Sequence, residues 1–257
     1  MFDLTGKHAL ITGASGGIGG AIGRALHGAG ATVALSGTRE GPLRELAGEL
    51  GERAHVLPCD LSDGAAVDAL PGEAAAAMGG LDVLVNNAGI AGPTAPLEEV
   101  PPDEWDRVVQ VNLTAAFDVT RLAIPALRKS PAGVILVMSS AAGRFGYPNR
   151  IAYAATKWGL IGFMKTLSME LGPFGIRANA ILPGTVDGDR IQRVFEGRAK
   201  LSGKSVDEVR DASMQNQSLR ALVDPRDIAS LAMFLASDAG KAISGQALSI
   251  DNDIQRL

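Results

Sequence analysis

Short apolar runs alternate with longer amphipathic stretches from one end of this chain to the other. The apolar runs predict buried strands at 8–11, 32–35, 54–57, 81–85, 134–138, 178–182 and 243–251. Stretches whose apolar residues recur at helical spacing predict helices at 17–28, 42–50, 65–78, 104–129, 151–171 and 225–236. This alternation predicts parallel strands joined by right-handed helical crossovers, with helices on both faces of the sheet.

No linker, internal repeat or block of like charges interrupts this pattern. The chain has 257 residues, which is enough for one large domain with a substantial core. The predicted fold class is therefore α/β. We expect residues 1–257 to form a single Rossmann-type domain, a doubly wound parallel sheet of about seven strands flanked by helices.

Composition narrows the function further. The formal net charge is -4 and there is no basic run, so a nucleic-acid partner is not expected. A single cysteine, Cys59, cannot form an internal disulfide and suits a reducing compartment. No signal peptide or membrane-length apolar run is evident, and the three histidines share no metal-ligand spacing. The sequence therefore predicts a soluble cytoplasmic protein with no membrane association and no metal.

A glycine-rich turn follows the first expected strand. Residues 12–19 read TGASGGIG and lead directly into the first expected helix. Glycines let the backbone approach a pyrophosphate, whose charge the helix N-terminus stabilises. A glycine-rich turn without a ligand is the alternative, but the position between a strand and a helix favours phosphate binding.

The stretch from Ser139 to Lys157 carries the clearest candidate for catalysis. Tyr153 and Lys157 are four residues apart, so on a helix they share one face. The Lys157 ammonium would lower the pKa of the Tyr153 phenol, which makes it a useful acid near neutrality. Ser140, at the end of a strand, could hold a carbonyl or hydroxyl oxygen against that phenol. For the two helical residues alone, an ordinary half-buried surface pair is the alternative.

Taken together, the motifs resemble the short-chain dehydrogenase/reductase family over nearly the whole chain. The first half is especially similar to bacterial 3-oxoacyl carrier-protein reductases. The matching motifs are Thr12-Gly13-x3-Gly17-x-Gly19, Asp60-Leu61, Asn86-Asn87-Ala88-Gly89, Asn112 in Val-Asn-Leu, Ser140, Tyr153-x3-Lys157 and Pro183-Gly184. Ser140 precedes Tyr153 by thirteen residues, the usual family spacing, which favours it over its neighbour Ser139.

The resemblance implies a catalytic set of four residues, Asn112, Ser140, Tyr153 and Lys157. Ser140 is implied to bind the substrate oxygen and Tyr153 to transfer a proton to it. Lys157 is implied to lower the Tyr153 pKa and to bind the ribose next to the nicotinamide. Asn112 is implied to lie at a helix kink and to hold a water in a proton relay, with a satisfied core amide as the alternative.

The resemblance also implies a nicotinamide cofactor along the carboxyl ends of the strands. The expected cofactor-binding residues are Gly13, Ser15, Gly17, Ile18, Gly19, Thr38, Arg39, Asp60, Leu61, Asn87, Ala88, Gly89, Tyr153, Lys157, Pro183, Gly184 and Val186. Asp60 could instead cap the next helix, or do both. Relatives often carry a Thr at the position of Gly188, so a contact there is in doubt and Thr185 is a possible substitute.

The end of the second strand bears on the choice of cofactor. NAD-preferring relatives carry an acidic residue here for the ribose diol, and none occurs at 36–39. Thr38 and Arg39 can instead hold a 2′-phosphate, so NADPH/NADP+ is favoured over NADH/NAD+. The alternative is that Arg39 points to solvent, and Gly16 lacks the basic residue that many NADP-binding relatives have there.

The polar stretch after Pro183 is where the chain resembles its relatives least. Residues of about 185–222 are expected to form a substrate lid, by resemblance. Arg190 and Arg193 could offer one helix face to an anionic substrate, although an ion pair with Glu196 is an alternative for Arg193. Further candidates for pocket walls lie in the loop before Tyr153, and these are Arg144, Tyr147, Asn149 and Arg150.

The leading hypothesis is an NADPH-dependent ketoreductase acting on a small-molecule carbonyl, with reversible alcohol oxidation. A 3-oxoacyl thioester and a sugar, polyol or small ketone are equally open as substrates. The alternatives are an NAD-dependent sugar or polyol dehydrogenase and a non-catalytic nucleotide sensor on the same fold. By resemblance we also expect a homotetramer.

Overall fold

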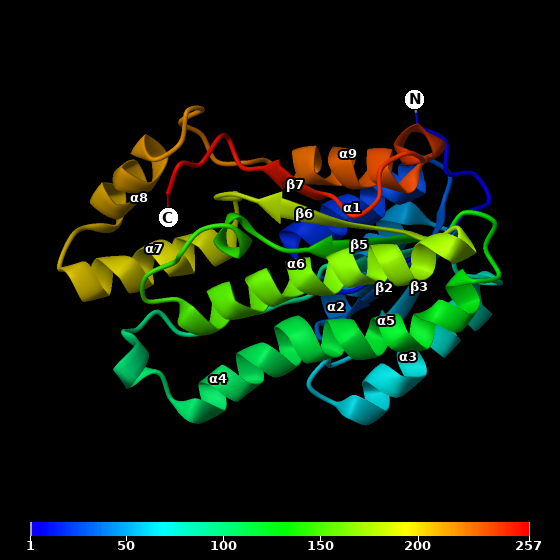
Figure 1. Cartoon of the computed structure of the whole chain (residues 1–257), viewed down its shortest axis with the longest axis horizontal. Helices are drawn as coiled ribbons and strands as arrows, with labels where there is room; N and C mark the ends of the chain where they lie inside the picture. The colour runs from blue at the N-terminus through cyan, green and yellow to red at the C-terminus, as the bar shows by residue number, and fades with distance from the viewer. Residues whose placement is uncertain (1, 257) are drawn as a thin grey trace.

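The computed structural model describes residues 2–256. Their strands form one sheet of seven parallel strands in the order β3-β2-β1-β4-β5-β6-β7 (Figure 1). The strands are β1 (His8–Ile11), β2 (Thr32–Gly37), β3 (Ala54–Pro58), β4 (Val83–Asn86), β5 (Val134–Met138), β6 (Arg177–Pro183) and β7 (Ala247–Ile250). The chain adds strands outward from β1 to β3 and then returns to the other side of β1. In doubly wound sheets such a reversal marks the ligand site, which is here expected between the carboxyl ends of β1 and β4.

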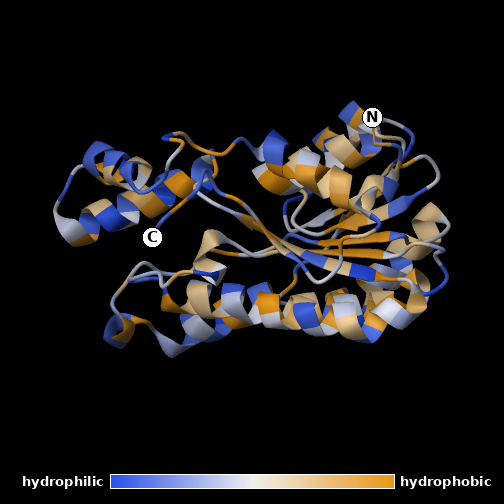
Figure 2. Cartoon of the chain, turned by 45° about the horizontal axis from the view of Figure 1, so that its top comes forward, coloured by the Kyte–Doolittle hydropathy of each residue, from blue (hydrophilic) through white to orange (hydrophobic). Residues whose placement is uncertain are grey.

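Helices cover both faces of the sheet, as Figure 1 shows. They are α1 (Gly17–Gly28), α2 (Glu40–Leu50), α3 (Gly64–Met78), α4 (Pro102–Val109), α5 (Ala115–Leu127), α6 (Ile151–Leu171), α7 (Asp189–Ser202), α8 (Val206–Gln215) and α9 (Pro225–Ala236). One core packs α1, α2 and α9 on the sheet, and another packs α3, α5 and α6 on the opposite face. Figure 2 shows the resulting apolar strands between two helical layers, typical of a parallel sheet.

The predicted fold class is confirmed, and two expected elements differ in detail. The expected helix at 104–129 is split by a π-helical turn, Gln110–Thr114, between α4 and α5. A π turn inserts an extra residue, so it changes the direction in which the following side chains point. The expected strand at 243–251 shortens to β7 because Gly245 has φ 68°, a left-handed conformation that ends an extended segment.

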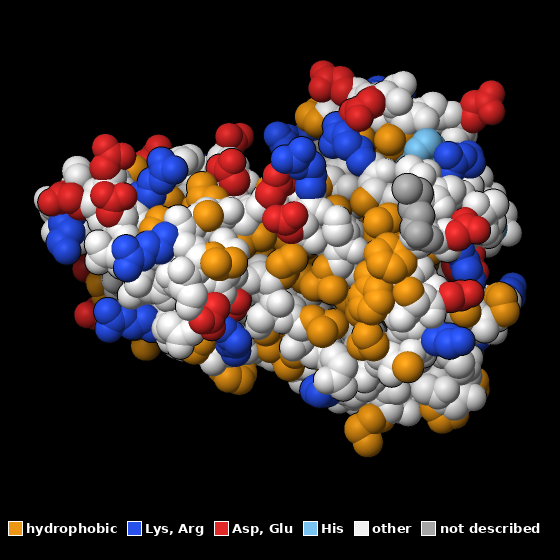
Figure 3. Space-filling view, turned by 90° about the horizontal axis from the view of Figure 1, so that it is seen from above, with side chains coloured by type: hydrophobic (Ala, Val, Ile, Leu, Met, Phe, Trp, Pro, Cys, Tyr) orange, Lys and Arg blue, Asp and Glu red, His pale blue; other side chains and the backbone are white. Residues whose placement is uncertain are grey.

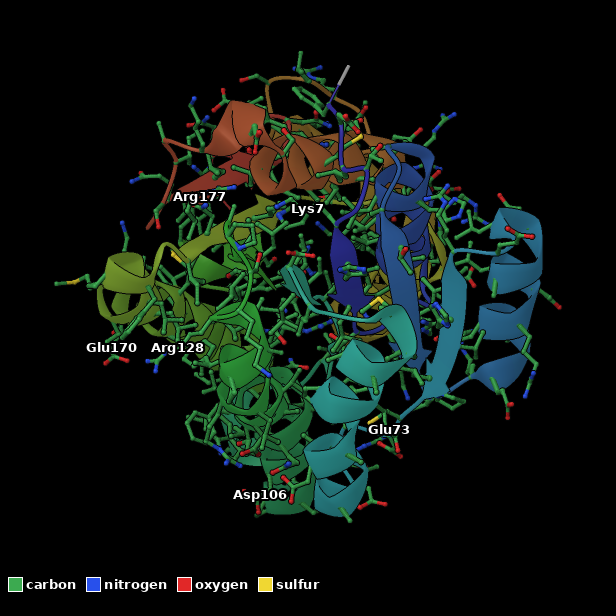
Figure 4. All side chains as sticks on the ribbon, turned by 90° about the vertical axis from the view of Figure 1, so that its right-hand side faces the viewer. Lys7, Glu73, Asp106, Arg128, Glu170 and Arg177 are labelled. Carbon is green, nitrogen blue, oxygen red and sulfur yellow. The ribbon has the colours of Figure 1, made fainter. Side chains whose placement is uncertain are left out.

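Polar contacts join the amino ends of the strands, and Figure 4 labels two residues at this end, Lys7 before β1 and Arg177 at the start of β6. The Asp82 carboxylate accepts hydrogen bonds from the backbone N–H of His8 and from the Ser130 hydroxyl, at 2.9 and 2.5 Å. Arg177 donates to the carbonyl oxygens of Leu235 and Ile243. These polar contacts hold together the amino ends of β1, β4 and β6.

Helices α7 and α8 extend beyond the carboxyl ends of the strands (Figure 1). They share a small core of Phe195, Ala199 and Val209, separate from the two main cores. Ser205 and Glu208 form a capping box that starts α8. Viewed from above, this end carries interspersed acidic and basic side chains, while apolar side chains gather nearer the middle (Figure 3). Within residues 2–256, no helix is both long and apolar enough to span a membrane.

Candidate active site

The Thr12 hydroxyl connects the carboxyl ends of β1 and β4. Thr12 Oγ1 donates to the carbonyl oxygen of Val85 and accepts from the backbone N–H groups of Asn87 and Ala88, at 3.1 to 3.3 Å. Asn87 Nδ2 returns a hydrogen bond to the carbonyl oxygen of Thr12 at 2.9 Å. These bonds hold the glycine turn against the end of β4.

Two glycines of this turn are required by packing and a third is not. Gly13 has φ 69°, and a Cβ there would lie 2.8 Å from the Ala88 Cα. A Cβ on Gly19 would lie 2.3 Å from the Gly13 carbonyl oxygen. A Cβ on Gly17, by contrast, would meet nothing within 4 Å. Gly17 begins α1, whose N-cap Gly16 provides no side-chain hydrogen bond. The free N–H groups beside an open space fit a pyrophosphate.

The end of β2 presents a basic group and no acidic one. Arg39 Nη2 donates to the carbonyl oxygen of Ser15 at 2.5 Å, so the guanidinium lies over the glycine turn. The nearest carboxylate in sequence is Glu40, which is paired with Arg44 at 2.5 Å. Thr38 and Arg39 are both exposed. The guanidinium is therefore available to an anionic group held next to the turn.

The third strand is followed by Asp60 and Leu61, the expected adenine contacts. Asp60 Oδ1 accepts from the backbone N–H and the hydroxyl of Ser62, at 2.9 and 2.7 Å, and these bonds lower the Asp60 pKa. The N-cap of α3 is Asp63, which accepts from the backbone N–H groups at the start of the helix. The alternative of Asp60 as the helix cap is wrong, because Asp63 occupies that position.

The four proposed catalytic residues converge where β5 ends. Lys157 Nζ donates to the carbonyl oxygen of Met138 at 2.8 Å, and its ammonium lies 5.5 Å from the Tyr153 ring centroid. Ser139 donates its hydroxyl to the carbonyl oxygen of Lys157 at 2.8 Å and is buried. The half-buried Ser140 hydroxyl instead accepts from the backbone N–H of Ala142 at 3.2 Å, and it is close enough to Tyr153 to lower the pKa of the phenol. Ser140 is thus the serine that lies beside the phenol.

The environment of Tyr153 makes its phenol more acidic than usual. Burial alone would raise the Tyr153 pKa, but the positive charges of Lys157, Arg190 and Arg150 lower it, as does the neighbouring Ser140 hydroxyl. The net direction is down. Burial also lowers the pKa of Lys157, and only Tyr153 opposes that effect. Such a coupled pair suits proton transfer.

Asn112 lies in the π-helical turn, so the predicted kink is present there. Its Oδ1 accepts from the backbone N–H of Ile90 at 2.7 Å, and its Nδ2 donates to the Ile90 carbonyl oxygen at 3.0 Å. A Cβ on Gly89 would lie 3.1 Å from Asn112 Oδ1 and 3.6 Å from Lys157 Nζ. The Asn112 amide and the Lys157 ammonium therefore lie close together on one side of Gly89. The amide is satisfied by the protein, and the proton relay stays a prediction.

The residues expected at the substrate side divide into two groups. Tyr147 packs edge-on against Tyr153, with ring centroids 6.4 Å apart, and Arg150 and Arg190 lie close to this pair. Arg144 instead forms an ion pair with Asp251 at 2.9 Å.

Four other expected site residues lie at the margins of this region. Asn149 has φ 62°, and its carbonyl oxygen accepts from the Ala95 backbone. Arg193 is exposed on α7, and the ion pair with Glu196 does not occur. After β6, Gly184 packs so tightly that a Cβ would lie 2.7 Å from the Asp251 Cα, and Val186 pairs with Val223.

One residue of this region was not predicted. Arg198 Cζ lies 4.8 Å from the Tyr147 ring centroid. It follows Arg190 by eight residues, about two helical turns, so both side chains project from a similar side of α7. That spacing is the signal that could have identified it.

Comparison with known proteins identifies the family. The family model described as enoyl-(acyl carrier protein) reductase matches residues 13–252. The chain belongs to the short-chain dehydrogenase/reductase family. Nodulation protein G of Rhizobium sp. is 38% identical over the full length of both chains. The 3-oxoacyl-(acyl-carrier-protein) reductase of Rickettsia felis is 37% identical and D-beta-hydroxybutyrate dehydrogenase of Cupriavidus necator 35%, each over at least 96% of both chains.

Solved structures also match nearly the whole chain, at slightly lower sequence identity. A variant of actinorhodin polyketide ketoreductase with NADPH matches with a TM-score of 0.91 and 32% identity, covering 96% of both chains. NAD+-bound xylitol dehydrogenase matches with a TM-score of 0.92 and 30% identity, covering 96% of this chain and 98% of the other. This short-chain dehydrogenase/reductase is therefore an oxidoreductase with a nicotinamide cofactor. The two neighbours differ in which cofactor they hold.

Proposed function

We propose that this protein is an NADPH-dependent carbonyl reductase that also oxidises the secondary alcohol in the reverse direction. The convergence of Ser140, Tyr153 and Lys157 beside the glycine turn carries this proposal. A phenol made acidic by a neighbouring ammonium can both give and take a proton near neutral pH. The names of the 3-oxoacyl reductase and hydroxybutyrate dehydrogenase relatives support this class of reaction.

The side chains divide the work at the substrate oxygen. The nicotinamide cofactor, when bound, supplies or accepts the hydride. The Ser140 hydroxyl donates a hydrogen bond to the substrate carbonyl oxygen and holds it at the Tyr153 phenol. Tyr153 gives its proton to that oxygen, so the product leaves as a neutral alcohol and the phenolate remains.

The phenolate must then be protonated again before the next turnover. The Lys157 ammonium stabilises it, because the two groups are close and Lys157 is buried. Lys157 also binds the ribose hydroxyls in this proposal. Lys157 then gives a proton to the phenolate and is itself reprotonated through a water held by Asn112, which lies on the same side of Gly89 as the ammonium.

Arg39 is proposed to select NADPH by binding the 2′-phosphate together with Thr38. A charge-assisted hydrogen bond contributes about 1.5–3 kcal/mol, so Arg39→Gln should lower kcat/KM for NADPH by roughly ten- to a hundredfold. The value for NADH should change little. The matched control is Arg44→Gln on the same helix, since Arg44 is already paired with Glu40. Steady-state kinetics with both cofactors test this. A wild-type enzyme that prefers NADH would contradict it.

A substrate panel separates the remaining functions. NADPH consumption is followed with 3-oxoacyl thioesters, small ketones and keto sugars, and the reverse reaction with polyols and NAD+. Rapid turnover of polyols with NAD+ would favour the dehydrogenase suggested by the xylitol dehydrogenase neighbour. Tight cofactor binding without turnover of any compound would favour a nucleotide sensor. We expect the protein to act in the cytoplasm, which cell fractionation would test.

The homotetramer is proposed on the apolar side chains that α5 and α6 leave exposed. Phe117 on α5 is 48% exposed and Trp158 on α6 is 51% exposed, and Ile151 extends the same helix surface. Such a patch is typical of an interface between copies. Trp158→Glu should therefore reduce the molar mass in solution, measured by light scattering after size-exclusion chromatography. A wild-type monomer at micromolar concentration would contradict the proposal.

A further inference from the structure

Three guanidinium groups gather around the two tyrosines of the candidate site. Arg150 Cζ lies 5.4 Å from the Tyr153 ring centroid and 5.5 Å from that of Tyr147. Arg198 Cζ lies 4.8 Å from the Tyr147 ring. Arg190 Nη2 donates to the carbonyl oxygen of Gly89 at 2.5 Å. Arg150 comes from the loop before α6 and the other two from α7, so cations approach from two sides.

None of the three has an acidic partner. Across residues 2–256, no carboxylate lies within 4.0 Å of Arg150, Arg190 or Arg198. Six other arginines do form such pairs, and these are Arg24, Arg44, Arg107, Arg121, Arg144 and Arg226. The positive charge at the site is therefore concentrated and uncompensated by the protein.

Arg150 is a buried cation without a carboxylate partner among the described residues. It is only 3% exposed, and its Nη atoms donate to Thr94 Oγ1 at 3.2 Å and to the Ala91 carbonyl oxygen at 2.7 Å. Its Nε has no partner. Burial lowers the Arg150 pKa, and the charges of Arg198 and Arg190 act in the same direction. A buried charge without a counter-ion is unfavourable, so it points to a ligand that supplies negative charge nearby.

The space beside these groups is small. A cavity of about 20 Å³ adjoins Tyr147, and its lining includes Arg198, Ile191, Phe195 and Arg256. This volume is about that of one water molecule, and it lies on the Arg198 side of Tyr147. Arg190 is close enough to Tyr153 to lower the pKa of the phenol, so a group bound by Arg190 lies near the reacting carbon.

We propose that the substrate is a short oxo acid whose carboxylate lies beside Tyr147, between Arg190 and Arg198, a few bonds from the carbonyl carbon. Arg150 adds its charge from behind the two rings and fixes their positions. This inference rests on the proposed carbonyl reductase activity and specifies its substrate class. The carboxylate is unchanged in the reaction, and the product is the corresponding hydroxy acid.

The test compares acids with their neutral esters. NADPH consumption is measured with pyruvate, 3-oxobutanoate and 4-oxopentanoate, each against its methyl ester, and with dihydroxyacetone phosphate. At least one acid should exceed its ester by tenfold or more in kcat/KM, since about two charge-assisted hydrogen bonds are lost in the ester. Arg198→Gln should lower kcat/KM for that acid by roughly ten- to a hundredfold, through KM, and leave its ester within about threefold.

Two further variants separate charge from structure. Arg198→Lys keeps the charge and should restore part of the preference for the acid. Lys200→Gln removes an exposed charge from the same helix and should leave both values unchanged. Thermal unfolding of each variant checks that α7 still folds.

The outcomes distinguish this inference from the function on which it depends. Equal turnover of acids and esters, or a preference for a phosphate ester or an acyl thioester, would overturn the oxo acid but leave the reductase intact. An equal effect of Arg198→Gln on acid and ester would do the same. No turnover of any carbonyl compound, despite NADPH binding, would overturn both the oxo acid substrate and the proposed reductase function.

Discussion

Replacing Tyr153 with Phe should abolish carbonyl reduction while NADPH still binds. The ring and its packing against Tyr147 remain, and only the proton donor is lost. General acid catalysis contributes about 10²–10⁴-fold, so kcat should fall by about a thousandfold. The dissociation constant of NADPH, measured by fluorescence titration, should stay within about threefold. Turnover is measured from NADPH absorbance with the best carbonyl of the panel.

The role of Tyr153 also predicts how the rate of alcohol oxidation depends on pH. Alcohol oxidation needs the phenolate, so its rate should rise as the pH passes the Tyr153 pKa. Lys157 lowers that pKa, and Lys157→Met should therefore move the rise in the oxidation rate to higher pH. A Tyr153→Phe enzyme with a folded thermal transition and more than a tenth of the wild-type kcat would refute the proposed mechanism.

Gly17→Ala and Gly19→Ala should separate cofactor binding from folding. The Cβ of Gly17→Ala enters open space, so the free energy of unfolding should stay within about 0.5 kcal/mol of wild type. NADPH binding should nevertheless weaken at least tenfold, because the methyl group occupies the place proposed for the pyrophosphate. The Cβ of Gly19→Ala would lie 2.3 Å from the Gly13 carbonyl oxygen, and such overpacking costs about 1–3 kcal/mol or more.

Urea unfolding and NADPH titration measure the two effects independently. Gly16→Ala provides a comparison within the same turn, since a Cβ there would lie 3.5 Å from its nearest neighbour, an ordinary contact. If Gly17→Ala binds NADPH as tightly as wild type, the cofactor does not approach the turn as proposed. If Gly19→Ala is as stable as wild type, the close contact does not limit the fold.

The sequence predicted the fold because its signals are local. A buried parallel strand such as β5 must be apolar on both faces, and an amphipathic helix must repeat its apolar residues with helical period, so both can be read from composition along the chain. The π turn at Asn112 could not be read in this way. In the sequence, the turn looks like part of an ordinary helix. In the structure, the turn places the Asn112 side chain where it bonds the backbone of Ile90 and lies near Lys157.

Ser140 and Arg150 show the same limit at the candidate site. The sequence favoured Ser140 over Ser139 by its spacing from Tyr153. The structure gives the physical basis, because the Ser139 hydroxyl already donates a hydrogen bond to the Lys157 carbonyl oxygen. For Arg150, the sequence suggested only a pocket wall. Its burial, its two tyrosine neighbours and the missing counter-ion depend on residues that are distant along the chain.

By itself, the sequence determined the doubly wound sheet, the glycine turn after β1, and the helix face that carries Tyr153 and Lys157. These follow from periodicity and from spacings of a few residues. Only the tertiary structure decided that Arg150, Arg190 and Arg198 surround the two tyrosines without an acidic partner. The reason is physical. The net charge at a site depends on which distant segments fold together. Whether an arginine finds a carboxylate partner therefore cannot be predicted from the residues near it in sequence.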